Sequence, residues 1–275
     1  GSISIIKNLK TFFCIWKFFK REKPDIVHLV TIKPYLYGGL IGRFTRIPSI
    51  VSAVSGLGSF FINKKFKSKL FHFLLFPFFR FAFNHKNQTV IVQNKEDAKI
   101  LIEWGVLNSN KIKLLKGSGV KIENFTKLEE ADGELVVCFA ARFIIDKGIN
   151  EFVSAAKILI KKGVNARFVL AGELDSQNPS SLNDIELKKI IDEGYVDILG
   201  YQNNIPELYS KSHIVCLPSY REGLPKALVE AAAASRAVVT TDVPGCRDAI
   251  IPNKTGLLVP VKKFRSTCHC LTRFT

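Results

Sequence analysis

The sequence contains no methionine and only six cysteines, and no secretory signal pattern is visible at its start. Because an initiator methionine is absent and the Gly-Ser start is typical of a cloning remnant, we expect a piece of a longer protein. The cysteines are too few and too scattered for a disulfide scaffold, which excludes the small disulfide-rich secreted class. The cysteine content favours a reducing compartment, so we expect a cytoplasmic protein.

Acidic residues are scarce in one half of the chain only. Residues 1–128 hold 22 Lys and Arg against 6 Asp and Glu, whereas residues 129–275 hold 18 of each, so the first half carries the whole formal net charge of +16. The first half also holds 16 of the 22 phenylalanines. With 47% hydrophobic residues the chain can bury a core, which excludes a mainly disordered protein. We predict two chemically different domains, residues 1–128 and residues 129–275.

Short apolar, β-branched runs alternate with helical patterns along the chain, which is typical of βαβ units and of parallel sheets covered by helices. Glycines and polar residues in Gly117–Gly133 indicate the domain boundary. We assign no element to Lys263–Thr275, which lack an apolar period. Strands are predicted at 25–30, 49–54, 89–93, 112–115, 135–141, 166–171, 196–199, 213–217, 237–241 and 256–259, and helices at 3–22, 64–83, 95–104, 148–162, 183–193, 205–211, 225–235 and 245–251.

Two basic residues follow the predicted strand 135–141. Arg142 and Lys147 precede a predicted helix. Because open α/β sheets bind ligands at the carboxyl ends of their strands, both cations are expected at the ligand site. Arg can grip phosphate oxygens with its forked guanidinium and Lys adds a compact charge, so the pair suits a diphosphate. The alternative is a solvated pair of cations at the start of a helix.

A second motif, Ser219–Pro225, follows a predicted strand and leads directly into a helix. Pro225 suits the first helical turn, Gly223 lets a ligand approach the backbone, and the free N–H groups of the helix can bind an anion. Each carboxylate of Glu222 and Glu230 can accept two hydrogen bonds from a vicinal diol, one on a sugar and one on a ribose. The alternative makes Glu222 an acid stabilised by the helix dipole and Glu230 an exposed helix residue.

Together these residues resemble the donor domain of the family-4 retaining glycosyltransferases, over about residues 133–261. The resemblance implies the GT-B fold, an α/β architecture with two Rossmann-like domains whose parallel sheets face each other across a cleft. It also implies an incomplete N-terminal domain, with the first strands lying before residue 1, and a closing helix lying after residue 261. Further matching segments are Asp242–Asp248 and Asn253–Val259 in the donor half, and Pro24–His28, Thr31–Pro34, Gly56–Gly58 and Gly117–Val120 in the acceptor half. With Leu174-Asp175 and Asn178-Pro179, these variants are most similar to the bacterial subgroup that extends glycans linked to undecaprenyl diphosphate.

The resemblance also implies roles for single residues. The donor diphosphate contacts Arg142 and Lys147, which stabilise the charge of the leaving group. Glu222 contacts the donor sugar and Glu230 the ribose. The family works without a metal or cofactor and keeps the anomeric configuration of the sugar. The implied site has Glu222, Arg142 and Lys147 as catalytic residues and Gly223, Leu224, Pro225, Glu230 and Tyr201 as donor-binding residues.

Two residues and two segments away from the donor-side motifs have candidate or excluded roles. His28 and Lys33 close the predicted strand 25–30 and its loop and are acceptor-side candidates, although a lone histidine at a strand end is more often structural. Many family members carry a histidine where this chain has Ser55-Gly56, so no catalytic histidine is assigned there. The segment Cys268–Cys270 has metal-ligand residue types but no second ligand pair at usable spacing, so no metal site is predicted.

The predicted activity is the transfer of a hexose or N-acetylhexosamine from a nucleoside diphosphate sugar, with uridine as the expected base, to a lipid-linked saccharide in surface polysaccharide or glycan assembly. The charge suggests a nucleic-acid-binding protein instead, but the basic residues alternate with Phe and Leu and no recognition motif is visible, so no nucleic-acid partner is expected. A nicotinamide-dependent oxidoreductase needs a G-x-G-x-x-G motif between strand and helix, which is absent. A nucleotide-binding but inactive fragment is the third hypothesis.

The basic, aromatic half of the chain is predicted to attach to the anionic inner face of the cell membrane without crossing it. In a helix over residues 5–21, the apolar side chains share one arc and the basic ones a neighbouring arc. The alternative is that the apolar arc packs on the sheet of its own domain. The stronger membrane candidate is Phe66–Phe83, whose apolar run is shorter than the roughly 20 residues that span a bilayer. The lysines at its start are Lys64, Lys65, Lys67 and Lys69.

Overall fold

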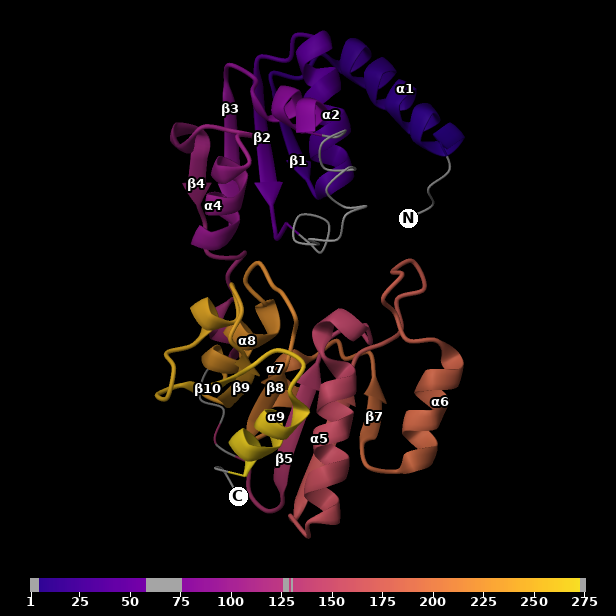
Figure 1. Ribbon diagram of the computed structural model, residues 1–275, viewed down its shortest axis with the longest axis vertical. Coiled ribbons are helices and arrows are strands. Elements are labelled where there is room, and N and C mark those ends of the chain that lie inside the picture. The colour runs from indigo at the N-terminus through magenta and orange to yellow at the C-terminus, as the bar shows by residue number, and fades with distance from the viewer. Residues whose placement is uncertain (1–4, 58–75, 126–128, 130, 273–275) are drawn as a thin grey trace. The chain divides into compact units, whose positions relative to one another are not determined.

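The computed structural model describes residues 5–57, 76–125, 129 and 131–272, and the chain divides into two compact units at Gly117 and Ser118 (Figure 1). Each unit is built on one sheet in which all paired strands are parallel. The predicted α/β class is therefore confirmed. The units divide before the expected position at residue 128, because Phe125 packs into the core of the second unit.

The first unit has a four-stranded sheet. Its described elements are α1 (Ile5–Glu22), β1 (Ile26–Val30), α2 (Ile32–Phe44), β2 (Ser49–Val54), β3 (Gln88–Val92), α4 (Lys95–Glu103), the 3-10 helix η2 (Ser109–Lys111) and β4 (Ile112–Leu114). The strands follow the order β1-β2-β3-β4, so each neighbour in the sheet is also the next strand along the chain. The predicted helix 64–83 lies partly outside the described residues, and residues 76–83 are helical.

Helix α2 corrects the sequence prediction, which placed no helix between residues 31 and 48. Its three glycines each disfavour an isolated helix by about 1 kcal/mol relative to alanine, so the local pattern does not predict one. In the folded unit these glycines allow close packing on the sheet. A Cβ on Gly38 would lie 2.5 Å from the Leu29 side chain, and one on Gly42 would lie 2.8 Å from that of Ile50. Tertiary packing therefore outweighs the low helix propensity.

The second unit has a six-stranded sheet. Its elements are η3 (Ile122–Phe125), β5 (Leu135–Ala140), η4 (Ile145–Lys147), α5 (Ile149–Lys161), β6 (Ala166–Ala171), α6 (Asp184–Glu193), β7 (Asp197–Gly200), α7 (Ile205–Ser210), β8 (Ile214–Leu217), α8 (Lys226–Ala233), β9 (Ala237–Thr241), η5 (Arg247–Ala249), β10 (Gly256–Val259) and α9 (Phe264–Leu271). The strand order is β10-β9-β8-β5-β6-β7. The central strand β8 is buried along its whole length, as expected where helices cover both faces of a parallel sheet.

The order of these strands creates a switch point between β5 and β8. From β5 the chain continues through α5 to β6 on one side, and from β8 it continues through α8 to β9 on the other side. Because such crossovers are right-handed, α5 and α8 cover opposite faces of the sheet. The loops after β5 and β8 thus leave the sheet in opposite directions, and open α/β sheets bind ligands at this position.

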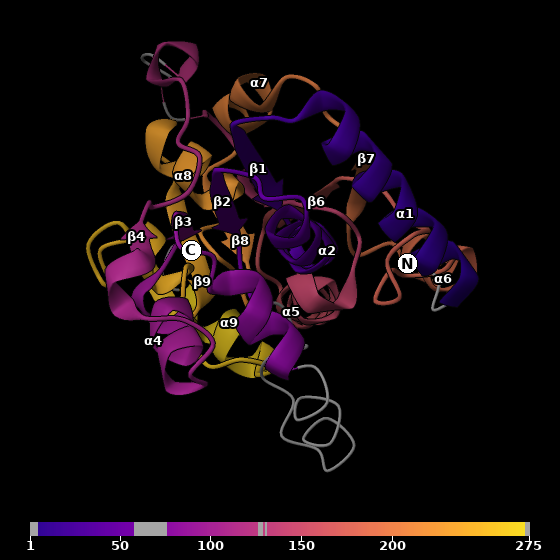
Figure 2. The same ribbon diagram turned by 90° about the horizontal axis from the view of Figure 1, so that it is seen from above.

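Helix α9 also corrects the sequence prediction, which assigns no element to Lys263–Thr275. Figures 1 and 2 show α9 beside α5, and its Cys268 and Leu271 side chains are buried in the core of the unit. The Cys268 thiol donates a hydrogen bond to the Ala155 carbonyl of α5 at 3.8 Å. A helix of two turns with cysteines at apolar positions is too short to show a clear period. The predicted helix 245–251 is also wrong, since only η5 forms there.

Candidate active site

The loop after β5 carries the first pair of predicted site residues. Arg142 lies just beyond the strand, and Lys147 ends η4 before α5 begins. Gly148 follows with a φ of 80°, and a Cβ there would lie 2.1 Å from the Pro218 carbonyl oxygen. Glycine permits both the left-handed backbone and this close approach. The loop after β5 therefore lies directly against the segment that follows β8.

Hydrogen bonds join these two loops. The Tyr220 amide donates to the Asp146 carbonyl at 2.9 Å, and the Ser219 hydroxyl donates to the same carbonyl at 3.0 Å. The Tyr220 hydroxyl donates to the Glu151 carboxylate in the first turn of α5 at 2.7 Å. Burial and this contact with Glu151 raise the pKa of the Tyr220 hydroxyl. The bonds hold the start of the Ser219–Pro225 motif against η4.

Lys147 and Glu222 form an ion pair across the two loops. Lys147 Nζ lies 2.5 Å from Glu222 Oε1, and the two side chains are only 22% and 10% exposed. The pair is thus largely withdrawn from solvent. This contradicts the alternative for Lys147, in which it is a solvated cation at the start of a helix.

The loop before η5 supports Glu222 from another side. Gly245 has a φ of 80°, and a Cβ there would lie 2.3 Å from the Gly223 carbonyl oxygen. The neighbouring Cys246 is buried, and its burial together with the nearby Glu222 raises the pKa of the Cys246 thiol to about 12. The thiol therefore stays neutral beside the ion pair at ordinary pH.

The Ser219–Pro225 motif leads into α8 as the sequence predicts. Pro225 is the residue immediately before the helix, with a φ of −71°. Glu230 lies in α8 and is buried, which contradicts its alternative interpretation as an exposed helix residue. Lys226, one turn earlier, has its Nζ 3.1 Å from Glu230 Oε1.

A cavity of about 270 Å³ lies at the carboxyl ends of β5 and β6. Arg142, Tyr201 and Glu230 line it, together with the backbone at Gly172. The structure therefore gathers three predicted donor-binding or catalytic residues around one cavity. Lys147 and Glu222 lie in the two loops that meet beside Gly148. The resulting site contains cations and carboxylates at the switch point of the sheet.

Asp175 is a site residue to which sequence reasoning gave no role. Its Oδ2 lies 2.5 Å from Arg142 Nη1, and Arg142 is 56% exposed whereas Asp175 is 21% exposed. Asp175 follows β6, which pairs directly with β5, so both residues leave the carboxyl ends of neighbouring strands. The order of the strands would have indicated this contact, but the local sequence pattern does not contain that order.

The acceptor-side candidates lie in the first unit. His28 is the third residue of β1 and is exposed, so it does not lie at the end of the strand as predicted. Lys33 is exposed in the first turn of α2, directly after β1. Between them, Thr31 has a φ of 75°, a conformation that β-branched residues rarely adopt. Such backbone conformations cost about 1–3 kcal/mol and cluster at functional sites.

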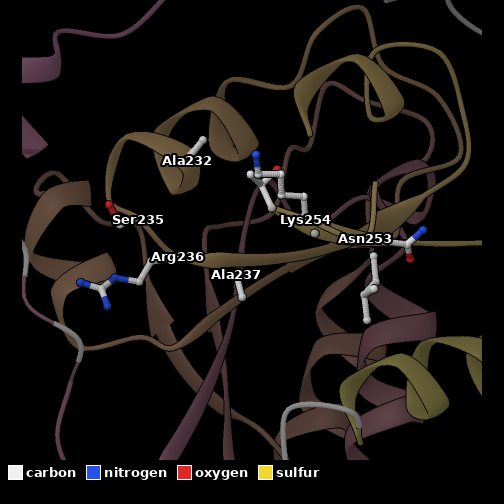
Figure 3. A pocket seen from close by; sticks show the side chains of 9 residues that line it. Ala232, Ser235, Arg236, Ala237, Asn253 and Lys254 are labelled. Carbon is white, nitrogen blue, oxygen red and sulfur yellow. The ribbon is translucent and has the colours of Figure 1, made fainter. Parts of the chain in front are cut away.

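A larger cavity of about 590 Å³ lies elsewhere in the second unit (Figure 3). It is lined by the first residues of β9 and β10, so it lies at the amino ends of these strands. In Figure 3 the Arg236 side chain points away from Lys254 and Asn253. The polar groups of this cavity do not converge on one point. Ligands of open α/β sheets bind at the carboxyl ends of the strands, so this cavity is not the candidate active site despite its larger volume.

Across the described residues, no three side chains of the His, Cys, Asp and Glu types are grouped so that they could hold a metal ion. This includes the described segment Cys268–Cys270, where Cys268 is buried against α5. The site does contain two cations, Arg142 and Lys147, each paired with a carboxylate.

Solved structures show which fold the chain has. HepE of Anabaena, solved in complex with UDP, matches with a TM-score of 0.73 and 17% identity, over 95% of this chain and 71% of that chain. Sucrose-phosphate synthase of Thermosynechococcus elongatus matches with a TM-score of 0.75 and 20% identity, over 96% and 68%. Two Rossmann-like units, each with a parallel sheet, define the GT-B glycosyltransferase fold, and the predicted fold class is confirmed.

The sequence matches two family models, one of which covers more than half of its length. Residues 120–266 match the model for glycosyl transferases group 1, and residues 2–94 match that for glycosyl transferase 4-like proteins. The chain belongs to the group 1 family of glycosyl transferases. The resemblance noted from the motifs is thereby confirmed, and the protein is a glycosyltransferase.

Two relatives have informative names. The N,N'-diacetylbacillosaminyl-diphospho-undecaprenol alpha-1,3-N-acetylgalactosaminyltransferase of Campylobacter jejuni is 32% identical over 267 residues, which are 92% of this chain and 68% of that protein. The UDP-Gal:alpha-D-GlcNAc-diphosphoundecaprenol alpha-1,3-galactosyltransferase of Escherichia coli is 26% identical, over 100% of this chain and 72% of that protein. The names of both relatives specify an acceptor linked to undecaprenyl diphosphate.

Proposed function

We propose that the second unit binds a uridine diphosphate sugar at the carboxyl ends of β5, β6 and β8, and that the protein transfers the sugar to a lipid-linked saccharide. One observation carries this proposal: the loops after β5 and β8 meet at the switch point, where Lys147 pairs with Glu222. Arg142, in the same loop as Lys147, lines a cavity together with Glu230. Cations that suit a diphosphate and carboxylates that suit sugar hydroxyls are thus combined in one site.

The residues act at different parts of the donor. Sugar transfer leaves additional negative charge on the departing diphosphate, and Arg142 and Lys147 stabilise that charge. Because these two side chains supply the positive charge, we propose that transfer needs no metal ion. Glu222 orients the donor sugar, and the buried Glu230 accepts hydrogen bonds from the ribose. The backbone of Gly223, Leu224 and Pro225 and the side chain of Tyr201 complete the donor site.

The family resemblance supports proposals for the anomeric configuration and for the acceptor. Transfer is proposed to retain the configuration at the anomeric carbon, as in the family that the motifs resemble. The acceptor is proposed to be a saccharide on a lipid diphosphate in bacterial surface polysaccharide or glycan assembly, and the donor sugar a hexose or N-acetylhexosamine. The names of the Campylobacter and Escherichia relatives support this choice. His28 and Lys33 remain the acceptor-side hypotheses.

The first unit is proposed to attach to the anionic inner face of the cell membrane through α1. Leu9 and Phe13 are 54% and 59% exposed and share one arc of the helix with Lys10, Lys17 and Lys20. Basic residues near an anionic leaflet contribute about 1 kcal/mol each. A surface that mixes lysines with exposed Leu and Phe suits lipid better than nucleic acid. Attachment would bring the enzyme to an acceptor that stays in the bilayer.

Two observations bear on this membrane proposal. None of the described helices combines the length and the apolar content that crossing a bilayer requires. One side of α1 packs against the core of the first unit through Phe12, Ile15 and Trp16, and Phe19 is buried there. For this side of the helix, the alternative of packing on its own domain is therefore correct. The segment favoured by the sequence, Phe66–Phe83 with its four lysines, lies largely outside the described residues.

The test is calorimetric titration of the full chain with UDP. Arg142→Glu and Lys147→Glu should each weaken binding about 10- to 100-fold, because each removes a charge-assisted hydrogen bond of about 1.5–3 kcal/mol. Arg167→Glu is the matched control, since Arg167 lies in β6 of the same sheet and is ion-paired with Asp197 at 2.5 Å. If both site variants bind UDP as tightly as the parent, the diphosphate assignment is wrong.

A further inference from the structure

Both cations assigned to the diphosphate are ion-paired with a carboxylate in the structure. The partner of Lys147 is Glu222, to which the proposed function gives a role at the donor sugar. The partner of Arg142 is Asp175, for which that function has no role. A carboxylate 2.5 Å from a phosphate-binding guanidinium affects anion binding, because it neutralises the charge that the phosphate needs.

Asp175 is held in place by its own loop. Its amide donates to the Ser181 hydroxyl at 3.0 Å, and its Oδ1 accepts from the Gln177 amide at 3.3 Å. The loop is fastened to the segment after Arg142 by backbone bonds, from the Phe143 amide to the Glu173 carbonyl at 2.8 Å and from the Ile145 amide to the Ser180 carbonyl at 2.7 Å. The carboxylate therefore has a fixed position.

Arg142 is less constrained than its partner. Its side chain is long and more than half exposed, and it lines the cavity that also contains Glu230. The guanidinium can thus pair either with the fixed carboxylate of Asp175 or with an anion in the cavity. We propose that Asp175 is a counter-ion that competes with the donor diphosphate for Arg142 and so weakens nucleotide binding. This inference rests on the proposed nucleotide-sugar site.

The competition acts most strongly on the product of the reaction. When the sugar leaves, the terminal phosphate of the nucleoside diphosphate is no longer esterified and carries more negative charge than in the donor. A fixed carboxylate beside Arg142 repels this product more than it repels the nucleotide sugar. Asp175 thereby favours release of the nucleoside diphosphate and limits inhibition by the product.

The experiment is UDP titration of Asp175→Asn in the full chain. Asparagine keeps a side-chain oxygen that can accept the Gln177 amide, so the loop is preserved while the charge is removed. We expect the Kd for UDP to fall about two- to fivefold, the range set by partly exposed ion pairs. Asp197→Asn is the matched control because it breaks the Arg167–Asp197 pair, which has the same 2.5 Å distance and lies in the same sheet. It should leave the Kd unchanged.

Two further measurements separate competition from a structural role. In an Arg142→Ala background, Asp175→Asn should tighten UDP binding much less than in the parent, because the contested cation is gone and only the direct repulsion by the carboxylate is removed. In a transfer assay, Asp175→Asn should lower the inhibition constant of UDP more than the KM of the donor. An unchanged or higher Kd for UDP in Asp175→Asn would overturn the inference and make Asp175 a residue that only positions Arg142. If the parent itself does not bind UDP, the proposed function fails and the inference fails with it.

Discussion

The ion pair of Lys147 and Glu222 places two charged side chains where little solvent reaches them. Both side chains are largely withdrawn from solvent, so each needs the charge of the other to offset its desolvation. Their pairing joins the loop after β5 to the loop after β8. A diphosphate that binds at Lys147 would therefore also alter the surroundings of the residue proposed to hold the sugar.

This arrangement predicts that Glu222→Gln lowers the rate of sugar transfer without a loss of affinity for UDP. The variant keeps the shape of the side chain but removes the charge that is proposed to act at the sugar. The kcat for sugar transfer should fall about 10- to 100-fold, while the affinity for UDP should not fall, because the substitution also removes the counter-ion of Lys147. Steady-state kinetics and calorimetry on the same preparations measure both quantities.

Glu207→Gln is the control for this variant, since Glu207 pairs with Lys211 on the exposed surface of α7. Its kcat and Kd should both equal those of the parent. Equal losses of kcat and of UDP affinity in Glu222→Gln would instead assign Glu222 to nucleotide binding.

At the scale of elements, single glycines decide how closely the segments around the site approach. Gly148 joins η4 to α5 and lets this turn touch the Pro218 carbonyl after β8. Gly245 does the same for the loop that supports Gly223. The loops after β5 and β8 are thus held together by close backbone contacts as well as by the ion pair of Lys147 and Glu222.

Replacing Gly148 tests this packing directly. Gly148→Ala should lower the free energy of unfolding by about 2–4 kcal/mol, because it adds backbone strain and a clash with the Pro218 carbonyl. Gly163→Ala is the matched control, since Gly163 has the same φ of 80° but nothing within 4 Å of an added Cβ. It should cost only about 1 kcal/mol.

Urea denaturation measures both unfolding energies, and UDP titration adds a functional readout. UDP binding should weaken in Gly148→Ala and remain unchanged in Gly163→Ala. Equal destabilisation by the two substitutions would show that the contact between Gly148 and Pro218 does not constrain the site.

At the scale of the whole molecule, the uneven charge has a structural counterpart. The first half carries the formal charge of +16, and its helix α1 exposes lysines beside Leu9 and Phe13. The second half has no net charge and contains the proposed donor site. The charge is therefore separated from the proposed donor site, which suits the proposed membrane-binding role of the first unit.

Cosedimentation with liposomes tests the membrane proposal. Binding should rise with the fraction of phosphatidylglycerol and fall with salt. Exchange of Lys10, Lys17 and Lys20 for Glu should reduce binding about 100-fold or more, because the three lysines together contribute about 3 kcal/mol. Phe13→Ser should weaken binding by less, and Ile185→Ser is its control, since Ile185 is 81% exposed on α6 of the second unit.

The same assay distinguishes the two candidate segments. A variant with Lys64, Lys65, Lys67 and Lys69 exchanged for Glu should lose binding if the Phe-rich segment contributes as the sequence predicts. If the folded parent stays in the supernatant with anionic liposomes at low salt, membrane attachment is wrong and the exposed face of α1 needs another explanation.

The sequence by itself determined the strands, the class of the fold and the positions of the main site motifs. Strand periodicity and the residues just after a strand are local properties, so β2 and β10 were predicted to the residue and Arg142 was expected beyond β5. The same holds for the Ser219–Pro225 motif, because a strand, a turn and a helix start follow one another in the sequence.

Only the tertiary structure decided which of these segments meet. Helix α2 forms despite its glycines because they fit against β1 and β2, and α9 forms because Cys268 and Leu271 are buried. The pairs Lys147–Glu222 and Arg142–Asp175 depend on the strand order β8-β5-β6. That order arises from packing between distant parts of the chain, and a local pattern carries no information about it.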